Sequence, residues 1–143
     1  MVQARGFVFF EIYVEDLAYY TRIFRGGLGF AVVEDDPDFV KLKSRRGTVL
    51  LNAMTLPATH PFANVKREPK RGMGVELGIV TDDVDSLVAA RARTIALGLD
   101  RCQISEIVHQ EWGMSDFRLL TKEGYFFRVT TPDPDEATSS SEP

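Results

Sequence analysis

The sequence predicts an α+β fold built from two copies of a βαβββ module. Three observations support this prediction: a repeat within the chain, a change from strand-like to helix-like periodicity in each copy, and turn signals between the strands that follow. A chain of 143 residues suits one domain of ordinary size. We therefore expect two modules, residues 7–55 and 73–131, within a single domain that spans residues 1–131.

The repeat is clearest where each module begins. Residues 9–17 (FFEIYVEDL) align with residues 76–84 (ELGIVTDDV) at a constant offset of 67 positions, and an amphipathic stretch that ends in Leu-Gly follows each. Both segments open with β-branched and aromatic residues, which are typical of strands. Asp16 and Asp83 are the predicted helix N-caps, because a short carboxylate accepts hydrogen bonds from the free N–H groups of a first turn.

Two amphipathic helices should follow these caps. The first is expected over residues 17–25 and should end at Gly26-Gly27, where glycine permits positive φ. The second is expected over residues 84–97, with Gly98 as its stop. Each helix has an apolar face to bury, and these faces comprise Leu17, Tyr20, Ile23 and Phe24 in the first, and Val84, Leu87, Val88, Ala92 and Ile95 in the second.

Strand candidates complete each module. They are residues 30–33, 39–43 and 49–54 in the first module, and residues 103–108, 117–121 and 125–131 in the second, with Lys122-Glu123-Gly124 as a hairpin turn. Residues 56–72, which join the modules, are read as a solvated connector, with a pocket rim as the alternative. Residues 132–143 are rich in Pro, Ser and acid and should form a disordered tail.

Charge and composition exclude several classes of partner. The net charge is −4, and the tail alone carries four acidic residues and no base, so the rest of the chain is neutral. A neutral body argues against binding to nucleic acid. The lone Cys102 excludes an intramolecular disulfide and a multi-cysteine metal site. No apolar run approaches the length of about 18 residues that spans a bilayer, so we expect a cytoplasmic protein that does not interact with membranes.

The order of motifs resembles a known superfamily. V-x-D-L and L-G-F in the first module, D-D-V-D in the second, and then W-G and G-Y are similar to the pattern of the vicinal oxygen chelate superfamily. That superfamily includes glyoxalase I, fosfomycin-resistance proteins, extradiol dioxygenases and bleomycin-resistance proteins. The resemblance covers residues 7–132 and implies two curved sheets that form an incomplete β-barrel.

The resemblance also implies four positions that hold a divalent metal in the enzymes of the superfamily. Carried onto this chain, they fall on Phe9, near Leu50, on Glu76 and on Arg128. Phe9 and Leu50 have no lone pair to offer, and Arg128 places a permanent cation where a second cation would bind. We therefore expect no metal and no cofactor, and exclude metal-dependent glyoxalase I and dioxygenase activities.

Strand alternation extends this set of positions. Glu11 and Tyr13 share the face of Phe9, and Phe126 shares the face of Arg128. Glu11, Glu76 and Arg128 should therefore converge. One interpretation is a structural Glu76–Arg128 ion pair that replaces the metal, with Glu11 beside it or in solvent. The other is a ligand pocket in which one uncompensated carboxylate has a raised pKa and acts as a base.

Aromatic residues would supply flat apolar walls for such a pocket. Trp112 stands in E-W-G, which is similar to a segment that borders the ligand groove of bleomycin-resistance proteins. The candidate ligand-binding set, without any metal ligand, is Phe9, Glu11, Tyr13, Leu50, Asn52, Glu76, Trp112, Phe126 and Arg128.

Three functions remain open at this stage, and we favour the first, which is not an enzyme. It is a metal-independent protein that binds an aromatic or planar metabolite or antibiotic in the barrel cavity, in resistance or biosynthesis. The alternative is a metal-free isomerase, cyclase or lyase acting on a carbonyl compound, with Glu11 or Glu76 as base and Arg128 stabilising an oxyanion. The third is a structural or regulatory protein with a collapsed cavity. A homodimer is expected, because an open barrel would leave its edge strands exposed.

Overall fold

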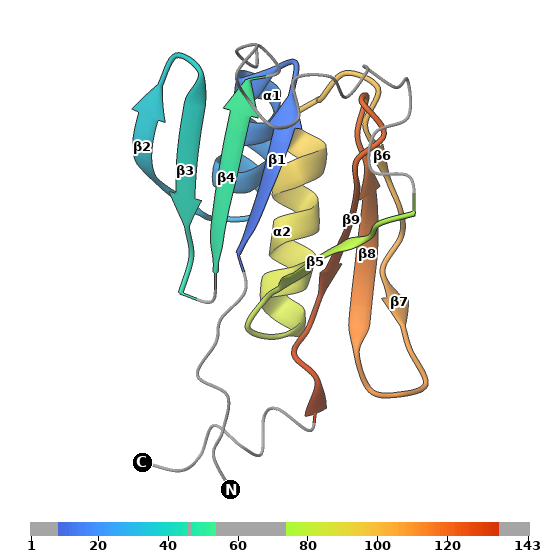
Figure 1. Cartoon of the computed structure of the whole chain (residues 1–143). Helices are drawn as coiled ribbons and strands as arrows, with labels where there is room; N and C mark the ends of the chain where they lie inside the picture. Colours follow the sequence, from blue (N-terminus) through green and yellow to red (C-terminus); the bar gives the residue numbers. More distant parts are fainter. Residues whose placement is uncertain (1–8, 46, 54–73, 135–143) are drawn as a thin grey trace, which may run out of the picture. The chain divides into compact units, whose positions relative to one another are not determined.

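The computed structural model describes residues 9–45, 47–53 and 74–134 (Figure 1). The chain divides into two compact units, residues 1–65 and 66–143, and each is described by itself. The predicted connector, residues 56–72, lies outside the described residues, as does the predicted tail from residue 135 onward.

The first unit has the predicted βαβββ order. Its strands form one mixed sheet in the order β1-β4-β3-β2, in which β1 runs parallel to β4 and the other pairs are antiparallel. Helix α1 packs against β3 and β4 (Figure 1). The elements are β1 (Phe10–Val14), α1 (Leu17–Thr21), the π-helical turn η1 (Arg22–Gly27), β2 (Ala31–Asp36), β3 (Phe39–Lys43) and β4 (Thr48–Ala53).

The second unit repeats this topology. Its sheet has the order β5-β9-β8-β6, with β7 also paired to β8, and β5 runs parallel to β9 as β1 does to β4. Helix α2 packs against β8. The elements are β5 (Leu77–Val80), α2 (Val84–Ala96), β6 (Gln103–Ile104), β7 (Val108–His109), β8 (Ser115–Leu120) and β9 (Phe126–Thr130). Together with the first unit, this confirms the α+β class.

Both predicted N-caps are confirmed. Asp16 Oδ1 accepts a hydrogen bond from the N–H of Tyr19 at 3.1 Å, and Asp83 Oδ1 accepts one from the N–H of Ser86 at 2.7 Å. These bonds satisfy donors that the first turn of a helix leaves free.

The end of the first helix differs from the prediction. The helix does not stop at Gly26-Gly27 but winds through both glycines as η1, and the residue with positive φ is Gly29, at +79°. The wider π-helical turn uses more residues before the chain reverses. Gly98, by contrast, has a φ of +59° where the second helix was predicted to stop.

One predicted strand is interrupted. The strand predicted over residues 103–108 is replaced by two short strands, β6 and β7, which both pair with β8. Between them the N–H of Ser105 donates to the carbonyl of Arg118 at 3.0 Å, and its Oγ accepts from the N–H of Arg118 at 2.8 Å. The serine hydroxyl thus replaces a backbone acceptor, and the ladder breaks there.

The buried face of α2 was predicted correctly at Leu87 and wrongly at its other positions. Val84, Val88 and Ile95 are 44%, 50% and 48% exposed, whereas the sheet side of the helix holds Leu87, Ala90 and Thr94. A threonine is accepted in this core because its hydroxyl donates to the carbonyl of Ala90 at 2.7 Å. An apolar stripe therefore remains on the outer side of α2.

Each unit has its own core. In the first unit it includes Ile12, Val14, Tyr20, Ile23, Phe24, Val40, Leu42, Val49 and Leu51, and in the second Ile79, Leu87, Ala90, Phe117, Leu119, Phe127 and Val129. In the part of the chain that the structure describes, no helix is long and apolar enough to cross a membrane.

Candidate functional site

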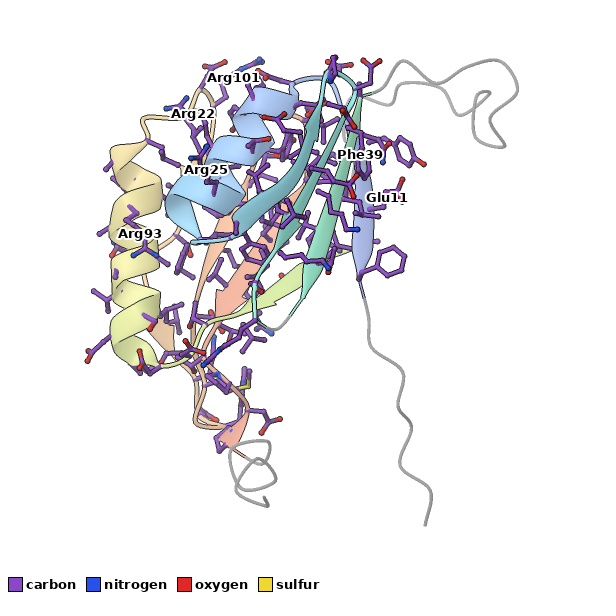
Figure 2. All side chains as sticks on the ribbon, turned by 90° about the vertical axis from the view of Figure 1, so that its left-hand side faces the viewer. Glu11, Arg22, Arg25, Phe39, Arg93 and Arg101 are labelled. Carbon is purple, nitrogen blue, oxygen red and sulfur yellow. The ribbon has the colours of Figure 1, made fainter. Side chains whose placement is uncertain are left out.

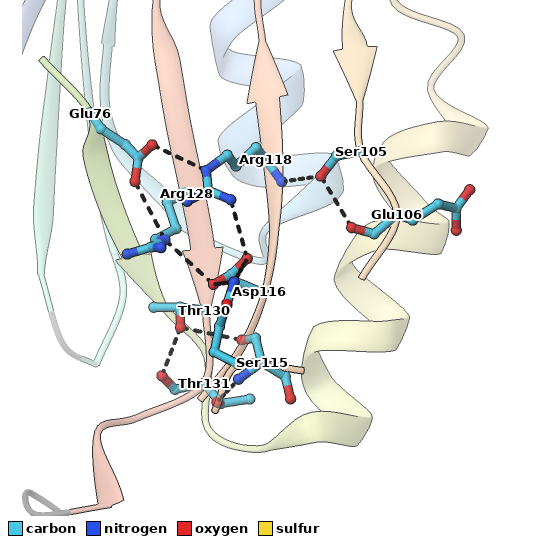
Figure 3. A network of polar contacts seen from close by, with 10 residues as sticks. Glu76, Ser105, Glu106, Ser115, Asp116, Arg118, Arg128, Thr130 and Thr131 are labelled. Carbon is cyan, nitrogen blue, oxygen red and sulfur yellow. Dashed lines mark hydrogen bonds and ion pairs between the residues drawn. The ribbon is translucent and has the colours of Figure 1, made fainter. Parts of the chain in front are cut away.

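A polar cluster lies on the sheet of the second unit. Alternation along β8 and β9 turns Phe117, Leu119 and Phe127 into the core and directs Asp116, Arg118 and Arg128 to the opposite face (Figure 3). Glu76, immediately before β5, joins them through its side chain. Arg118 and Arg128 stand directly opposite each other on paired strands. Two like charges in that position repel unless acids separate them.

Two carboxylates supply this separation. Glu76 Oε2 lies 3.2 Å from Arg118 Nε, and its Oε1 lies 3.4 Å from Arg128 Nε. Asp116 Oδ1 lies 3.6 Å from Arg118 Nη1, and its Oδ2 lies 3.5 Å from Arg128 Nε. Both acids thus bridge both arginines, and the four charges cancel.

Asp116 is the most deeply buried member of the cluster. Its side chain is 2% exposed, against 33% for Glu76, 34% for Arg118 and 29% for Arg128. Gln110 Nε2 donates to Asp116 Oδ2 at 3.1 Å. A carboxylate removed from water costs several kcal/mol unless it is paired, so these contacts account for its burial.

The cluster changes the charge balance that the sequence suggested. The prediction placed two acids against one base and left one carboxylate uncompensated. In the second unit, two carboxylates face two guanidinium groups, because Arg118 and Asp116 were missed. The signal was present: the hairpin turn at residues 122–124 fixes the register that sets Arg118 opposite Arg128 and Asp116 opposite Thr130.

Trp112 stands on the turn between β7 and β8 and is 57% exposed. Gly113 follows it with a φ of +91°, and a Cβ there would lie 3.0 Å from Pro134 Cγ, so the turn requires glycine. The carbonyl of Gln110 accepts from the N–H of Gly113 at 3.1 Å. Because the Gln110 side chain also binds Asp116, the turn with Trp112 is tied to the polar cluster.

The first unit has its own polar contacts on the side of the sheet opposite α1, where Figure 2 shows Glu11 and Phe39. Glu11 Oε1 accepts from Asn52 Nδ2 at 2.5 Å and from the hydroxyl of Tyr13 at 3.3 Å. Leu50 pairs with Glu11 across β1 and β4. Phe39, which sequence reasoning missed, pairs with Asn52.

The remaining predicted residues lie on the same two faces. Phe9, 54% exposed, precedes β1. Phe126 is half-buried on β9, on the face of Arg128, opposite Leu120. Glu11 belongs to the first unit, and Glu76 and Arg128 belong to the second, so the convergence of all three stays a prediction.

Tyr13 is expected to ionise at higher pH than an ordinary tyrosine. Partial burial, the charge of Glu11 and the hydrogen bond to Glu11 all raise the pKa of Tyr13 above 10.0, burial most strongly. Because the folded-state pKa of Tyr13 is raised, the protonated side chain stabilises the folded protein. This contribution to stability is complete below the unfolded-state pKa and is lost as pH rises through the folded-state pKa. A pH titration followed by tyrosinate absorbance should show a tyrosine of raised pKa in the wild type that is missing in Tyr13→Phe. Glu11→Gln should lower that pKa; an unchanged titration would contradict the assignment.

The donor set does not fit the divalent metal of the superfamily. Both oxygens of Glu76 already face guanidinium groups, and Arg128 is a cation at the position to which the resemblance assigns a ligating glutamate. Phe9 and Leu50 are apolar. Among the described residues, no group of three His, Cys, Asp or Glu side chains is placed to hold a metal ion.

A separate open hollow of about 560 Å³ lies in the first unit, between α1 and the turn that joins β2 and β3. Arg22, Asp35 and Asp36 border it. None of the predicted ligand-binding residues lines this hollow.

The fold matches solved structures although no protein-family profile and no curated protein matches the sequence. A glyoxalase/bleomycin resistance protein/dioxygenase family enzyme from Burkholderia phytofirmans PsJN superposes with a TM-score of 0.68 at 17% identity, over 86% of this chain and 95% of that one. Lactoylglutathione lyase from Agrobacterium tumefaciens gives 0.65 at 17% identity, over 90% and 95%. A glyoxalase-related enzyme from Fulvimarina pelagi gives 0.67 at 13% identity, over 90% and 89%.

These structural similarities establish the fold of the chain. The chain has the fold of the glyoxalase/bleomycin resistance/dioxygenase proteins, which confirms at the level of the fold the resemblance to the vicinal oxygen chelate superfamily. At these identities the likeness concerns the fold alone. Function must be argued from the site, because one fold hosts many chemistries.

Proposed function

We propose that this protein is a metal-independent binder of a small aromatic or planar molecule, a metabolite or an antibiotic. Each unit offers candidate binding residues on the open face of its own sheet. The observation that carries the proposal is the neutral set Glu76, Asp116, Arg118 and Arg128 on the second sheet, in which Glu76 and Arg128 fall at positions where the resemblance implies metal ligands.

Binding is preferred to catalysis because the candidate bases are engaged. Both oxygens of Glu76 lie against guanidinium groups, and Glu11 accepts hydrogen bonds from Asn52 and Tyr13. A general base needs a lone pair directed at the proton that it removes. An aromatic ligand can instead stack on the flat guanidinium groups and on Phe126. A cytoplasmic location belongs to the same proposal.

Native mass spectrometry of the protein, purified without added metal, tests this function. We expect a retained small molecule, or binding of planar compounds from a screened set, with no stoichiometric divalent ion. Incubation with Mn²⁺, Ni²⁺ or Zn²⁺ before the measurement should not change the mass of the folded protein. A stoichiometric metal ion that survives buffer exchange would contradict metal independence.

We also infer a homodimer, in which the apolar stripe on α2 meets the same stripe of a second copy. Val84, Val88 and Ile95 are exposed along one side of the helix. The first turn carries Asp85 and the last turn Arg93. A two-fold axis pairs the helices antiparallel, which sets the acidic end of one beside the basic end of the other.

Val88→Asp should convert the dimer into a monomer, because it places a charge in the centre of the stripe. Light scattering at micromolar concentration measures the mass. The matched control is Val33→Asp, since Val33 is 49% exposed on β2 and Val88 is 50% exposed on α2. A wild-type protein that is monomeric, or equal dissociation by both variants, would contradict this interface.

A further inference from the structure

Arg128 is fixed at one end and open at the other. Its Nε lies 3.4 Å from Glu76 Oε1 and 3.5 Å from Asp116 Oδ2, so two carboxylates form ion pairs with the base of the guanidinium group, although the buried Nε makes no hydrogen bond to a described residue. No described residue accepts a hydrogen bond from either of its Nη groups. Figure 3 shows the guanidinium group reaching over β5. The terminal donors therefore remain for a partner outside the described residues.

Gly78 leaves space beside this open end. It pairs with Arg128 across β5 and β9. A Cβ added at Gly78 would meet no atom within 4 Å, and its φ lies outside the left-handed region. The backbone therefore does not require glycine, and glycine within a strand costs stability. A glycine of this kind is typical of a place where a ligand approaches the backbone closely.

The surroundings of this space are apolar on two sides. Val80 follows Gly78 on the same face of β5 and is 38% exposed. Phe126 precedes Arg128 on the same face of β9 and pairs with Leu120. A flat hydrocarbon body can lie against these side chains while one end reaches Arg128.

Charge decides which end group suits Arg128. A guanidinium fork donates two parallel hydrogen bonds to a planar carboxylate. Because the two acids and two arginines of the cluster already cancel, a ligand with one negative charge leaves less uncompensated charge at the site than a ligand with two. A carboxylate fits this condition, and a doubly charged phosphate does not.

We propose that Arg128 recognises the single carboxylate of a flat ligand whose body covers Gly78. This deepens the proposed function and rests on it, because it names the chemical class of the ligand that the second sheet binds. The two Nη groups of Arg128 hold the carboxylate. Glu76 and Asp116 position the guanidinium group and do not contact the ligand.

Binding of 2-naphthoate to the full chain, measured calorimetrically at low salt and neutral pH, tests the inference. The comparison compounds are 2-naphthamide, which is neutral, and 2-naphthyl phosphate, which is doubly charged. A hydrogen bond between charged groups corresponds to about 10- to 100-fold in affinity. We expect 2-naphthoate to bind at least about tenfold more tightly than either comparison compound.

Two variants test separately the guanidinium fork of Arg128 and the space beside Gly78. Gly78→Leu fills the space over β5 and should weaken 2-naphthoate binding at least about tenfold while its unfolding curve stays close to that of wild type. Arg128→Lys keeps the charge but loses the fork, and should remove the preference for the acid over the amide. Gly47→Leu is the matched glycine control, since a Cβ there also meets nothing within 4 Å. Arg25→Gln is the control for the loss of a positive charge away from the site, because Arg25 is exposed on η1 in the first unit.

Equal binding of acid and amide, or tighter binding of the phosphate, would overturn the carboxylate assignment. If Gly78→Leu still weakens both compounds, the small-molecule site on this sheet stands and only the ligand class is wrong. If 2-naphthoate binds at millimolar concentration to Gly78→Leu as it does to wild type, the location is wrong. Failure of the proposed function itself would leave no compound, native or synthetic, sensitive to either site variant.

Discussion

Asp116→Ala should lower the free energy of unfolding by about 2–4 kcal/mol. The carboxylate is 2% exposed and stands 3.6 Å and 3.5 Å from the two arginines. Its removal leaves Arg118 and Arg128, opposite each other on β8 and β9, with Glu76 as their shared acid in the cluster. It also leaves the Gln110 side chain without its acceptor. Loss of the carboxylate that orients Arg128 should therefore destabilise the second unit.

Urea denaturation followed by circular dichroism measures this effect. Asp100→Ala is the control, because the Asp100 side chain is 68% exposed and its ion pair with Arg101 is at the surface. Exposed pairs contribute about 0–1 kcal/mol. Equal stability of the two variants would show that the cluster does not support the sheet.

Phe24→Ala should cost about 3–5 kcal/mol. Phe24 is 0% exposed at the centre of the first unit, and its ring centroid lies 6.0 Å from that of Phe10 and 5.6 Å from that of Phe30. The truncation leaves a cavity between η1 and β1 that neighbouring rings can fill only in part.

Phe24→Leu should cost less than the alanine variant, because it keeps most of the apolar volume. Val33→Ala, at a position 49% exposed on β2, should change the stability by less than about 0.5 kcal/mol. A Phe24→Ala variant as stable as Val33→Ala would contradict the assigned core.

The module order could be predicted from the sequence because the repeat, the caps and the turns are local signals. Asp16 and Asp83 accept from first-turn N–H groups wherever the helices later pack. Gly124 in the predicted hairpin turn has a φ of +90°. These features depend on a few neighbouring residues, so they survive any error about distant contacts.

Features that depend on packing between elements could not be predicted in the same way. The apolar pattern of α2 offered two faces, and the sheet took the one with Thr94, whose hydroxyl is satisfied inside the helix. The interruption of the predicted strand at Ser105 depends on hydrogen bonds to Arg118, a residue thirteen positions later.

The candidate site was predicted in part for the same reason. The superfamily positions identified Glu76 and Arg128 as candidates, and these two residues form an ion pair at 3.4 Å. Asp116 and Arg118 have no counterpart among the four superfamily positions, and only the strand register brings them to the same face. The register that the hairpin turn sets therefore decides which charged residues share this face.

A crystal structure of the full chain with 2-naphthoate bound, grown in the presence of Mn²⁺, tests whether Arg128 binds a carboxylate at a site without metal. We expect the carboxylate on the Nη groups of Arg128, the ring system over Gly78, and no metal ion against Glu76. A divalent ion coordinated by Glu76, or a ligand bound away from the second sheet, would contradict this expectation.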